Sequence, residues 1–440
     1  MTSQLFTLEE YDLANKIQRL RGPDLTNYLE FDGYNIFHNL LSVTGAFTPQ
    51  PFVKNDSACM FNGQIYNSHH FGDYNSDGFC ILDAYKEFGL EFPNQLDGEF
   101  AICIMDSKRN VVILATDPFG TKPLHFAVEN GQIGVASYHS ALLSLGFKNI
   151  TKVPANTLVV ISKKTYEIQL QCPLWKFDTN QYKMHYEHWI LAFENSIQKR
   201  TRDIRENIFI GLSSGYDSGA IACELLKQNI EFKSYSFYNN ENRDVLDSRR
   251  NLIDSVASSE SVLTNKQEES SQLNYLLSKA EPGYYYIYSN RHDKVYNHSY
   301  LDDRASIGLG IICSYARKEG RKIYLSGQGS DEIMSDYGQA GEAIYDHSNF
   351  CGIFPSDLDY IFPWPSFYGS TQESYLLKDE HVAGAYSVET RYPFLDKFLV
   401  QEFLHIDHRM KNFFYKAPLK QYFEINNFPV ALDVKFGFVP

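Results

Sequence analysis

The segment IFIGLSSGYDSGAIACELL, residues 208–226, most constrains the fold of this chain. A short apolar run breaks into serine, glycine and aspartate and then becomes apolar again, which predicts a buried strand over 208–212, a tight turn and a helix starting near Ser218. Helices alternate with single strands through this half of the chain. The pattern predicts helices over 184–200, 218–228 and 305–318 and strands over 207–212, 232–237 and 322–326. Such alternation favours a parallel α/β sheet, whose ligands bind at the carboxyl ends of the strands.

The polar turn at 213–218 has two interpretations. It is an ordinary turn if its Gly and Ser residues only form the turn and Asp217 and Ser218 only cap the helix. It is an anion cradle if the backbone N–H groups at the helix start and the serine hydroxyls face a phosphate. A carboxylate such as Asp217 beside a phosphate then requires a divalent cation between them. A second strand that breaks into polar residues, YLSGQGSDE at 324–332, lies at the same predicted edge and favours the cradle.

The chain of 440 residues is too long for one ordinary core, so we expect two domains. Residues 30–170 contain short β-prone runs, such as VVILATD, QIGVAS and NTLVVIS, separated by turn residues, which predicts layered antiparallel sheets with few helices. The pattern changes after PLWKFDTNQ, so we place the domains at 1–178 and 179–440. The stretch 284–302 has no apolar period and is predicted to be an excursion or flexible loop.

Composition excludes several classes of function. A net charge of −14 without a basic stripe disfavours nucleic acid as a partner. No apolar run of about 18 residues and no signal pattern occurs, so we expect a cytoplasmic protein without a membrane partner. The seven cysteines have no paired short spacing, which argues against zinc and a disulfide framework and favours small core residues. A homodimer is left open.

Several motifs, in collinear order, resemble the asparagine synthetase and β-lactam synthetase family. LSSGYDSGA (212–220) and LSGQGSDE (325–332) resemble the loops of N-type ATP pyrophosphatases, and DDRASIGLGI (302–311), SVETRYPFLDKFLV (387–400) and VKFGF (434–438) resemble synthetase segments. LRGPD (20–24), FNGQIYN (61–67), LDGEFAICIMD (96–106) and ATDPFGTKPLH (115–125) are similar to the glutaminase domain of class II amidotransferases. The resemblance implies an α+β N-terminal domain with Ntn-hydrolase-like layered antiparallel sheets, and an α/β C-terminal ATP-pyrophosphatase domain of the adenine nucleotide α-hydrolase-like type.

The N-terminal domain departs from the glutaminase pattern. The family uses an N-terminal cysteine thiolate, but here Thr2 follows Met1 and no cysteine precedes Cys59. The family's glutamine-binding arginine falls at Leu40, and its Asn-Gly-Glu is Asn-Gly-Gln ending at Gln64. Asp77 matches the aspartate that holds the glutamine amine. We expect an inactive glutaminase-like scaffold, with a Thr2 nucleophile after removal of Met1 as the alternative.

The family divides by the source of its amine. Asparagine synthetases use ammonia from glutamine, whereas β-lactam and carbapenam synthetases lack the cysteine and use an amine on the substrate. This chain resembles the second group because it also lacks the catalytic cysteine. Gln328 stands where the β-lactam enzyme has a tyrosine that acts with a distant glutamate, matched here by Glu389. Because an amide side chain has no useful pKa, Gln328 cannot be a general base.

The resemblance implies an AMP-forming carbon–nitrogen ligase that uses ATP and Mg²⁺. It would adenylate a small-molecule carboxylate, release pyrophosphate and join the acyl group to an amine that does not come from glutamine hydrolysis. The implied ATP-binding residues are Leu212, Ser213, Ser214, Gly215, Asp217, Ser218, Ser326 and Gly327. Asp217 and Asp331 would hold Mg²⁺, Arg304 and Gln328 would contact the substrate, and Lys435 and Glu389 would be catalytic. For Glu389 an ion pair with Arg391 or Arg304 is the structural alternative.

Other functions remain open at this stage. They are an ammonia-dependent amidation of a small acid or a sugar carboxylate, a lasso-type peptide cyclase, and a protein that binds ATP without turnover. Lys435 argues against the last of these, because a lysine over the phosphates serves turnover.

Overall fold

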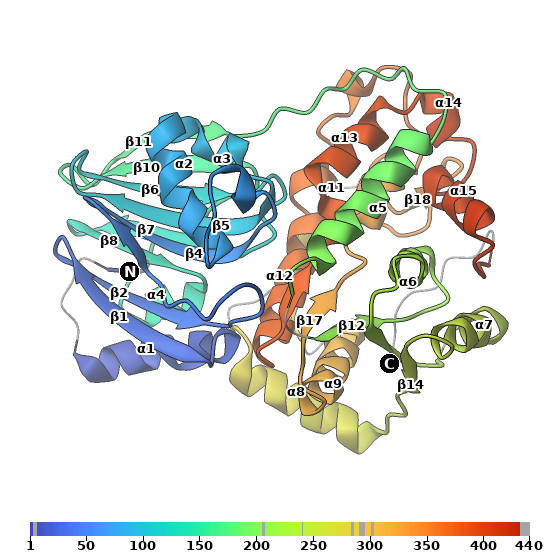
Figure 1. Ribbon diagram of the computed structural model, residues 1–440, viewed down its shortest axis with the longest axis horizontal. Coiled ribbons are helices and arrows are strands. Elements are labelled where there is room, and N and C mark those ends of the chain that lie inside the picture. Colours follow the sequence, from blue (N-terminus) through green and yellow to red (C-terminus); the bar gives the residue numbers. More distant parts are fainter. Residues whose placement is uncertain are drawn as a thin grey trace. The chain divides into compact units, whose positions relative to one another are not determined.

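Figure 1 shows the computed structural model of the chain, which describes residues 1–2, 7–204, 207–239, 241–282, 286–289, 295–300 and 303–431. The chain divides into two compact units. The first contains Met1–Lys176, Leu277–Tyr284 and Ala383–Glu389, and the second contains the remaining residues. Each unit is built around its own sheets.

Within the described residues, the first unit contains three antiparallel sheets. One has six strands in the order β11-β10-β6-β5-β4-β3. The other side of the unit has the pair β1-β2 and the three-stranded sheet β8-β7-β9, and Thr2 forms isolated bridges to Asn35 and Gly134 that connect them. The strands of this unit are β1 (Leu25–Phe31), β2 (Tyr34–Leu40), β3 (Phe52–Lys54), β4 (Ser57–Ile65), β5 (Gly98–Asp106), β6 (Val111–Thr116), β7 (His125–Glu129), β8 (Gln132–Ala136), β9 (Thr151–Lys152), β10 (Thr157–Ser162) and β11 (Ile168–Pro173).

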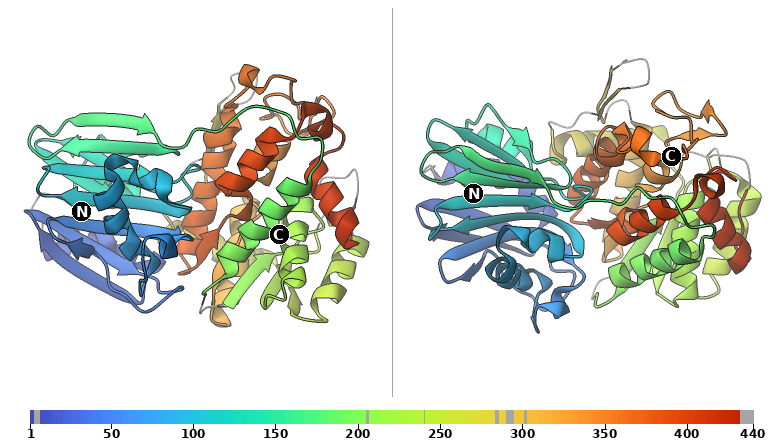
Figure 2. Two further views of the ribbon diagram at one scale, coloured as in Figure 1. Left: turned by 45° about the horizontal axis from the view of Figure 1, so that its top comes forward. Right: turned by 90° about the horizontal axis from the view of Figure 1, so that it is seen from above.

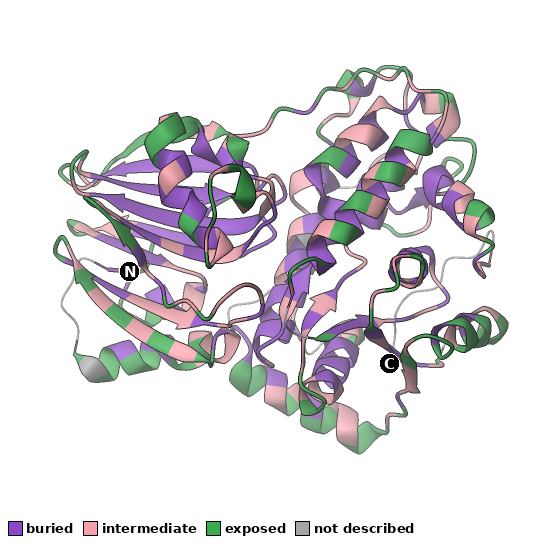
Figure 3. Ribbon diagram, viewed as in Figure 1, coloured by how far each residue is buried: buried purple, intermediate pink, exposed green. Residues whose placement is uncertain are grey.

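Helices cover both outer faces of these sheets. Helices α2 (Cys80–Phe88) and α3 (Phe92–Gln95) pack on the six-stranded sheet, and Ile81 and Phe92 share its core cluster with Ile102. Helix α1 (Leu8–Arg21) packs on β2 and α4 (His139–Ser144) on β7. Strands β6 and β10 are buried along their whole length because layers cover both of their faces (Figure 3). The layered antiparallel sheets predicted for this half of the chain are confirmed.

The second unit is built on a five-stranded sheet in the order β14-β13-β12-β17-β20. Strand β12 runs parallel to β13 and β17, and β13 runs parallel to β14. The parallel α/β sheet predicted from helix–strand alternation is therefore confirmed. Its strands are β12 (Asn207–Gly211), β13 (Phe232–Ser236), β14 (Ser258–Ser261), β17 (Arg321–Leu325) and β20 (Glu389–Arg391).

Helices pack around this sheet (Figure 2). Helix α6 contacts α5, α7 and α15, while α9 packs on β12 and β17. The helices are α5 (Glu187–Thr201), α6 (Tyr216–Lys227), α7 (Arg243–Ile253), α8 (Lys266–Lys279), α9 (Arg304–Lys318), α10 (Ser330–Met334), α11 (Pro365–Tyr368), α12 (Thr371–Gly384), α13 (Lys397–His405), α14 (His408–Lys411) and α15 (Ala417–Asn426). Two short strands, β18 (Gly338–Gln339) and β19 (Glu342–Ala343), form a hairpin between α10 and α11.

Two local predictions need correction. Helix α6 begins at Tyr216 rather than near Ser218, because Gly215 takes the extended N-cap conformation two residues earlier than expected. The stretch 284–302, predicted to be an excursion or a flexible loop, contains an antiparallel hairpin of β15 (Tyr286–Ser289) and β16 (Val295–His298). Alternating tyrosines support pairing without an apolar period, since aromatic residues favour strands.

Most of the cysteines are core residues, as the sequence predicts. Five of the seven cysteines are buried and all seven are free thiols. Among the residues that the structure describes, no helix is long and apolar enough to cross a membrane.

Candidate active site

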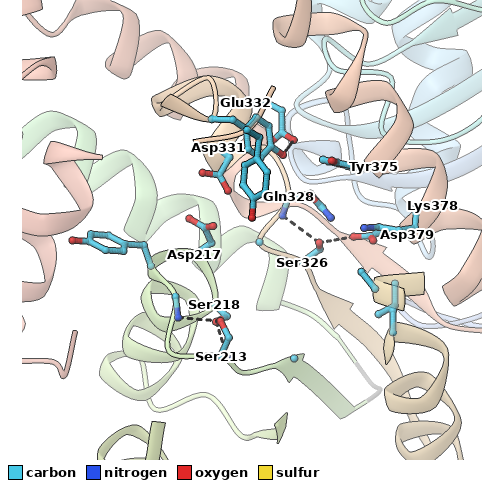
Figure 4. A pocket seen from close by; sticks show the side chains of 18 of the residues that line it. Ser213, Asp217, Ser218, Ser326, Gln328, Asp331, Glu332, Tyr375, Lys378 and Asp379 are labelled. Carbon is cyan, nitrogen blue, oxygen red and sulfur yellow. Dashed lines mark hydrogen bonds between the residues drawn. The ribbon is translucent and has the colours of Figure 1, made fainter. Parts of the chain in front are cut away.

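A cavity of about 690 Å³ opens in the second unit where β12 and β17 end (Figure 4). The loop after β12 leads into α6, and the loop after β17 leads into α10. The two polar segments found in the sequence therefore meet at one edge of the sheet. The predicted residues that line the cavity are Ser213, Gly215, Asp217, Ser218, Ser326, Gly327, Gln328 and Asp331.

The loop between β12 and α6 folds around two serines. The Ser213 and Ser218 hydroxyl oxygens lie 2.8 Å apart, and the Ser213 N–H donates to Ser218 Oγ at 3.0 Å. The Gly215 N–H donates to Ser213 Oγ at 3.1 Å. These contacts draw the start of α6 into a compact turn, with hydroxyl groups and helix N–H groups at the cavity. Such a turn suits an anion, because the start of a helix carries partial positive charge.

Arg249 supports this loop from behind. Its Nη1 donates to the carbonyl oxygens of Ser213 and Gly215, both at 2.7 Å, and the side chain is fully buried. A Cβ on Gly219 would lie 2.5 Å from the guanidinium carbon, so only glycine fits there. Burial lowers the pKa of Arg249 to about 10, which leaves it charged at neutral pH. The sequence analysis missed this residue, because an arginine inside a helical segment carries no distinguishing signal.

The loop between β17 and α10 approaches the first loop closely. A Cβ on Gly327 would lie 2.9 Å from the Cβ of Asp217. Gly329 has a φ of 93° and begins α10, with its N–H donating to Glu332 Oε2 at 3.1 Å. Burial raises the pKa of Glu332 to about 7. Two glycines thus allow the second loop to place Asp331 beside Asp217.

Asp217 and Asp331 converge on one buried ammonium group. Lys416 Nζ lies 2.5 Å from Asp217 Oδ1 and 2.9 Å from Asp331 Oδ1, and the Lys416 side chain is 1% exposed. Tyr415 also donates to Asp331 Oδ1 at 2.8 Å. Burial raises the pKa of Asp217, an effect that Lys416 opposes and Asp331 reinforces. Lys416 was not predicted from the sequence.

The pair of carboxylates fits a magnesium site shared with a substrate. Both carboxylates contact the same ammonium group, so this position attracts positive charge. Both residues also line the cavity. Within the described part of the chain, no group of three or more His, Cys, Asp or Glu residues could hold a metal alone. Mg²⁺ typically takes one or two carboxylates and completes its shell with water and phosphate oxygens.

Other predicted residues lie elsewhere. Leu212 is buried, and its N–H donates to the Tyr235 carbonyl. Ser214 turns away and donates to Glu241. Arg304 is exposed at the start of α9 and lies 3.6 Å from Glu269, while its neighbours Asp303 and Ala305 line the cavity.

The two predicted catalytic residues have different outcomes. Glu389 lies in β20 and is not among the described residues that line it. Lys435 lies outside the described residues.

The part of the cavity that is lined by α12 was not predicted from the sequence. Helix α12 supplies Tyr375, Lys378 and Asp379 to the lining. Ser326 Oγ donates to Asp379 Oδ2 at 2.6 Å, and Lys378 Nζ lies 4.7 Å from the Tyr375 ring centre. Tyr337, Tyr345 and His347 add aromatic surface at this end. The sequence pattern of α12 shows only a helix, so nothing in it distinguished these positions.

In the first unit, the residues that match the glutaminase pattern are held by structural contacts. Asp77 Oδ2 accepts the Ile65 N–H at 2.7 Å. Leu40 is 8% exposed, and Gln64 is also buried. The Asn62 amide nitrogen is buried without a hydrogen-bond partner. No cationic side chain stands at position 40, where the pattern places a glutamine-binding arginine.

Fold and site together define a chain with a layered antiparallel unit and a parallel α/β unit that carries a polar cavity. Residues 7–174 match the sequence model of the glutamine amidotransferase domain. A putative glutamine-hydrolysing asparagine synthetase of Methanocaldococcus jannaschii is 27% identical over 84% of this chain and 69% of that protein. The human glutamine-hydrolysing asparagine synthetase is 26% identical over 92% of this chain and 77% of that protein. The chain is therefore similar to asparagine synthetases along most of its length, and its N-terminal part matches a glutamine amidotransferase domain.

Two solved structures align with parts of this chain. One is described as the allosteric regulatory enzyme of purine biosynthesis, with a TM-score of 0.32 and 14% identity over 46% of this chain and 57% of that one. The other is the glutamine phosphoribosylpyrophosphate amidotransferase from B. subtilis, with a TM-score of 0.26 and 12% identity over 68% of this chain and 67% of that one. The chain spans less than two thirds of the first of these proteins.

Proposed function

We propose that this protein is an ATP-dependent ligase that activates a substrate carboxylate as its adenylate and joins it to an amine not released from glutamine. The observation that supports this most is the convergence of Asp217 and Asp331, from two neighbouring loops, beside the serine-lined start of α6. The relationship to asparagine synthetases supports an amidation reaction. Carboxylates need activation because oxide is a very poor leaving group.

The residues of the cavity have separable roles in this proposal. Ser213, Ser218 and the first N–H groups of α6 would bind the β- and γ-phosphates of ATP. Asp217 and Asp331 would hold Mg²⁺, which when bound neutralises charge on the departing pyrophosphate. Lys416 contacts both aspartates, fixes their positions and opposes the effect of burial on the pKa of Asp217. The protein thus supplies orientation and electrostatics to the displacement at the α-phosphorus.

ATP is expected to yield AMP and pyrophosphate. The loop at 213–218 lacks the lysine of a Gly-Lys-Ser phosphate loop, whose chemistry usually gives ADP. Phosphorus NMR of ATP, Mg²⁺ and a panel of small carboxylic acids, with hydroxylamine as a trap for acyl adenylates, would identify the products. ADP as the sole product would reject the assignment.

Glutamine is not expected to be hydrolysed. Leu40 offers no cation to the glutamine carboxylate, and the buried thiols of this unit are poor nucleophiles. Burial raises the pKa of Cys103 to about 12 and that of Cys59 well above its usual range. Thr2 is 2% exposed, and its backbone pairs with Asn35. The measurement is glutamate release from glutamine against a control without enzyme. Release that disappears in Thr2→Val would instead support the threonine alternative.

A further inference from the structure

The cavity has a second end that the binding of ATP does not explain. Asp379, on α12, lines the cavity and is 2% exposed. Ser326 Oγ donates to its Oδ2 at 2.6 Å, and the Ser326 N–H in turn donates to the Arg391 carbonyl at 2.9 Å. The Gln328 N–H donates to Ser326 Oγ at 3.3 Å. Asp379 is therefore a fixed carboxylate, held by the same loop that carries Asp331.

Aromatic rings line the cavity one helical turn from this carboxylate, because Tyr375 precedes Asp379 by four residues on α12. Tyr337 and Tyr375 lie with ring centres 6.2 Å apart, and Tyr337 packs edge-on against His347 at 4.4 Å. Tyr337 donates its hydroxyl to Glu332, which fixes the ring. Tyrosine faces attract organic cations and bury alkyl groups, and neither property serves a bare phosphate.

The charge of the cavity also favours a cation. Six carboxylate residues line it against two lysines. The carboxylates are Asp217, Asp303, Asp331, Glu332, Asp346 and Asp379. Two of them are assigned to Mg²⁺ by the proposed function. The acidic residues that line the cavity outnumber its lysines, and a positively charged substrate complements this charge.

We propose that Asp379 binds the ammonium group of a primary alkyl amine against the tyrosine wall and removes its proton before amide formation. This inference rests on the proposed function and names the class of its second substrate. It also supplies the base that Gln328, in the same loop as Ser326, cannot be.

The proposed step balances without a further reactant. Asp379 takes one proton from the ammonium and becomes a carboxylic acid. The freed nitrogen lone pair forms the C–N bond with the acyl adenylate, and the bond between the acyl carbon and the phosphate oxygen breaks with its electron pair leaving on AMP. The second nitrogen proton is lost to water. The products are the amide and AMP.

The surroundings of Asp379 suit this role. Burial raises its pKa to about 6, while Lys378, Ser326 and Gln328 favour the ionised form and Glu380 opposes it. Tyr324 on β17 and Cys313 on α9 also lie near enough to interact with its charge. A general base is most effective when its pKa lies near the working pH. It is then mostly ionised before the reaction and still basic enough to accept a proton. Amide formation is therefore expected to decline below about pH 6, with pyrophosphate exchange as the reference at each pH.

The binding test needs no knowledge of the natural substrate. The full chain is saturated with Mg²⁺ and α,β-methylene ATP, and n-butylammonium chloride is then titrated by saturation-transfer NMR with n-butanol and ammonium chloride as comparisons. The amine is expected to bind more tightly than either comparison. Asp379→Asn is expected to weaken butylammonium about tenfold and leave butanol unchanged, because it removes one charge-assisted hydrogen bond. Asp244→Asn, which makes the same charge change on the exposed start of α7, is the matched control.

The possible results separate the amine site at Asp379 from the proposed ligase function. Equal butylammonium affinity in Asp379→Asn and the parent overturns the role of Asp379, and binding of ammonium chloride as tight as that of butylammonium overturns the alkyl amine class. Retained binding of α,β-methylene ATP in Asp379→Asn shows that the variant is folded. If the parent binds butylammonium through Asp379 but never forms AMP and pyrophosphate, the proposed ligase function fails while the amine site stands. Where turnover is found, loss of amide with retained pyrophosphate exchange in Asp379→Asn, partly rescued by Asp379→Glu, supports the catalytic role.

Discussion

Replacement of Lys416 with methionine is expected to lower the free energy of unfolding by about 3–5 kcal/mol, because it removes the buried cation shared by two partly buried carboxylates. The Lys416 side chain is 1% exposed and is the cation between Asp217 and Asp331. Methionine fills similar space, so the loss reports charge rather than a cavity. Urea unfolding followed by circular dichroism measures the change, at pH 7 and at pH 5.

The stability that Lys416→Met loses is expected to depend on pH. Burial and Asp331 already raise the pKa of Asp217 from 3.8, and removing Lys416 removes the largest opposing effect. A carboxyl whose pKa is raised in the folded state holds its proton more tightly there than when unfolded, so stability falls as pH rises from that ordinary value through the raised one. The variant is therefore expected to be closer to the parent at pH 5 than at pH 7.

The matched control is Lys266→Met, the same chemical change at an exposed position at the start of α8. Its effect is expected to stay within about 0.5 kcal/mol, as for most surface substitutions. If Lys416→Met changes the free energy of unfolding equally little, with no pH dependence, the Lys416 ammonium does not offset the negative charge of the two aspartates.

Turn chemistry made the serine-lined half of the cavity, which we propose binds ATP, predictable from the sequence. Each loop follows a buried strand, and glycines, serines and acids at such a junction have few purposes besides capping and anion binding. The structure brings Ser213, Ser218, Asp217 and Asp331 to one edge because parallel neighbouring strands end together. Local sequence thus sufficed where local backbone geometry positions the side chains.

The rest of the cavity depends on contacts between residues far apart in the sequence. Lys416 reaches Asp217 from 199 residues away, at an N-cap position with a φ of 46°. No periodic or capping signal marks such a residue, because a lysine before a helix is usually solvated. Asp379 is likewise one acid in an ordinary helical pattern. Arg304 shows the converse, since a motif match placed it in the site while the helix start directs it toward Glu269.

Replacement of Asp217 with asparagine is expected to slow pyrophosphate formation by about two to four orders of magnitude. Several kcal/mol of charge stabilisation by a metal ion depend on its carboxylate ligand, and each 1.36 kcal/mol is about tenfold in rate. The fold should lose far less, because the carbonyl oxygen of the introduced amide can still accept from Ser330 and Lys416, and Lys416 keeps Asp331. Pyrophosphate release and melting temperature would be measured together on Asp217→Asn, Asp331→Asn and the control Asp244→Asn. The Asp217 side chain is 26% exposed at the cavity, so its charge can act on a ligand that binds there. An aspartate that served only in a structural ion pair would make no contact with a ligand. Variants that melt well below the parent yet turn over at the parental rate per folded molecule would show that the two aspartates only hold Lys416.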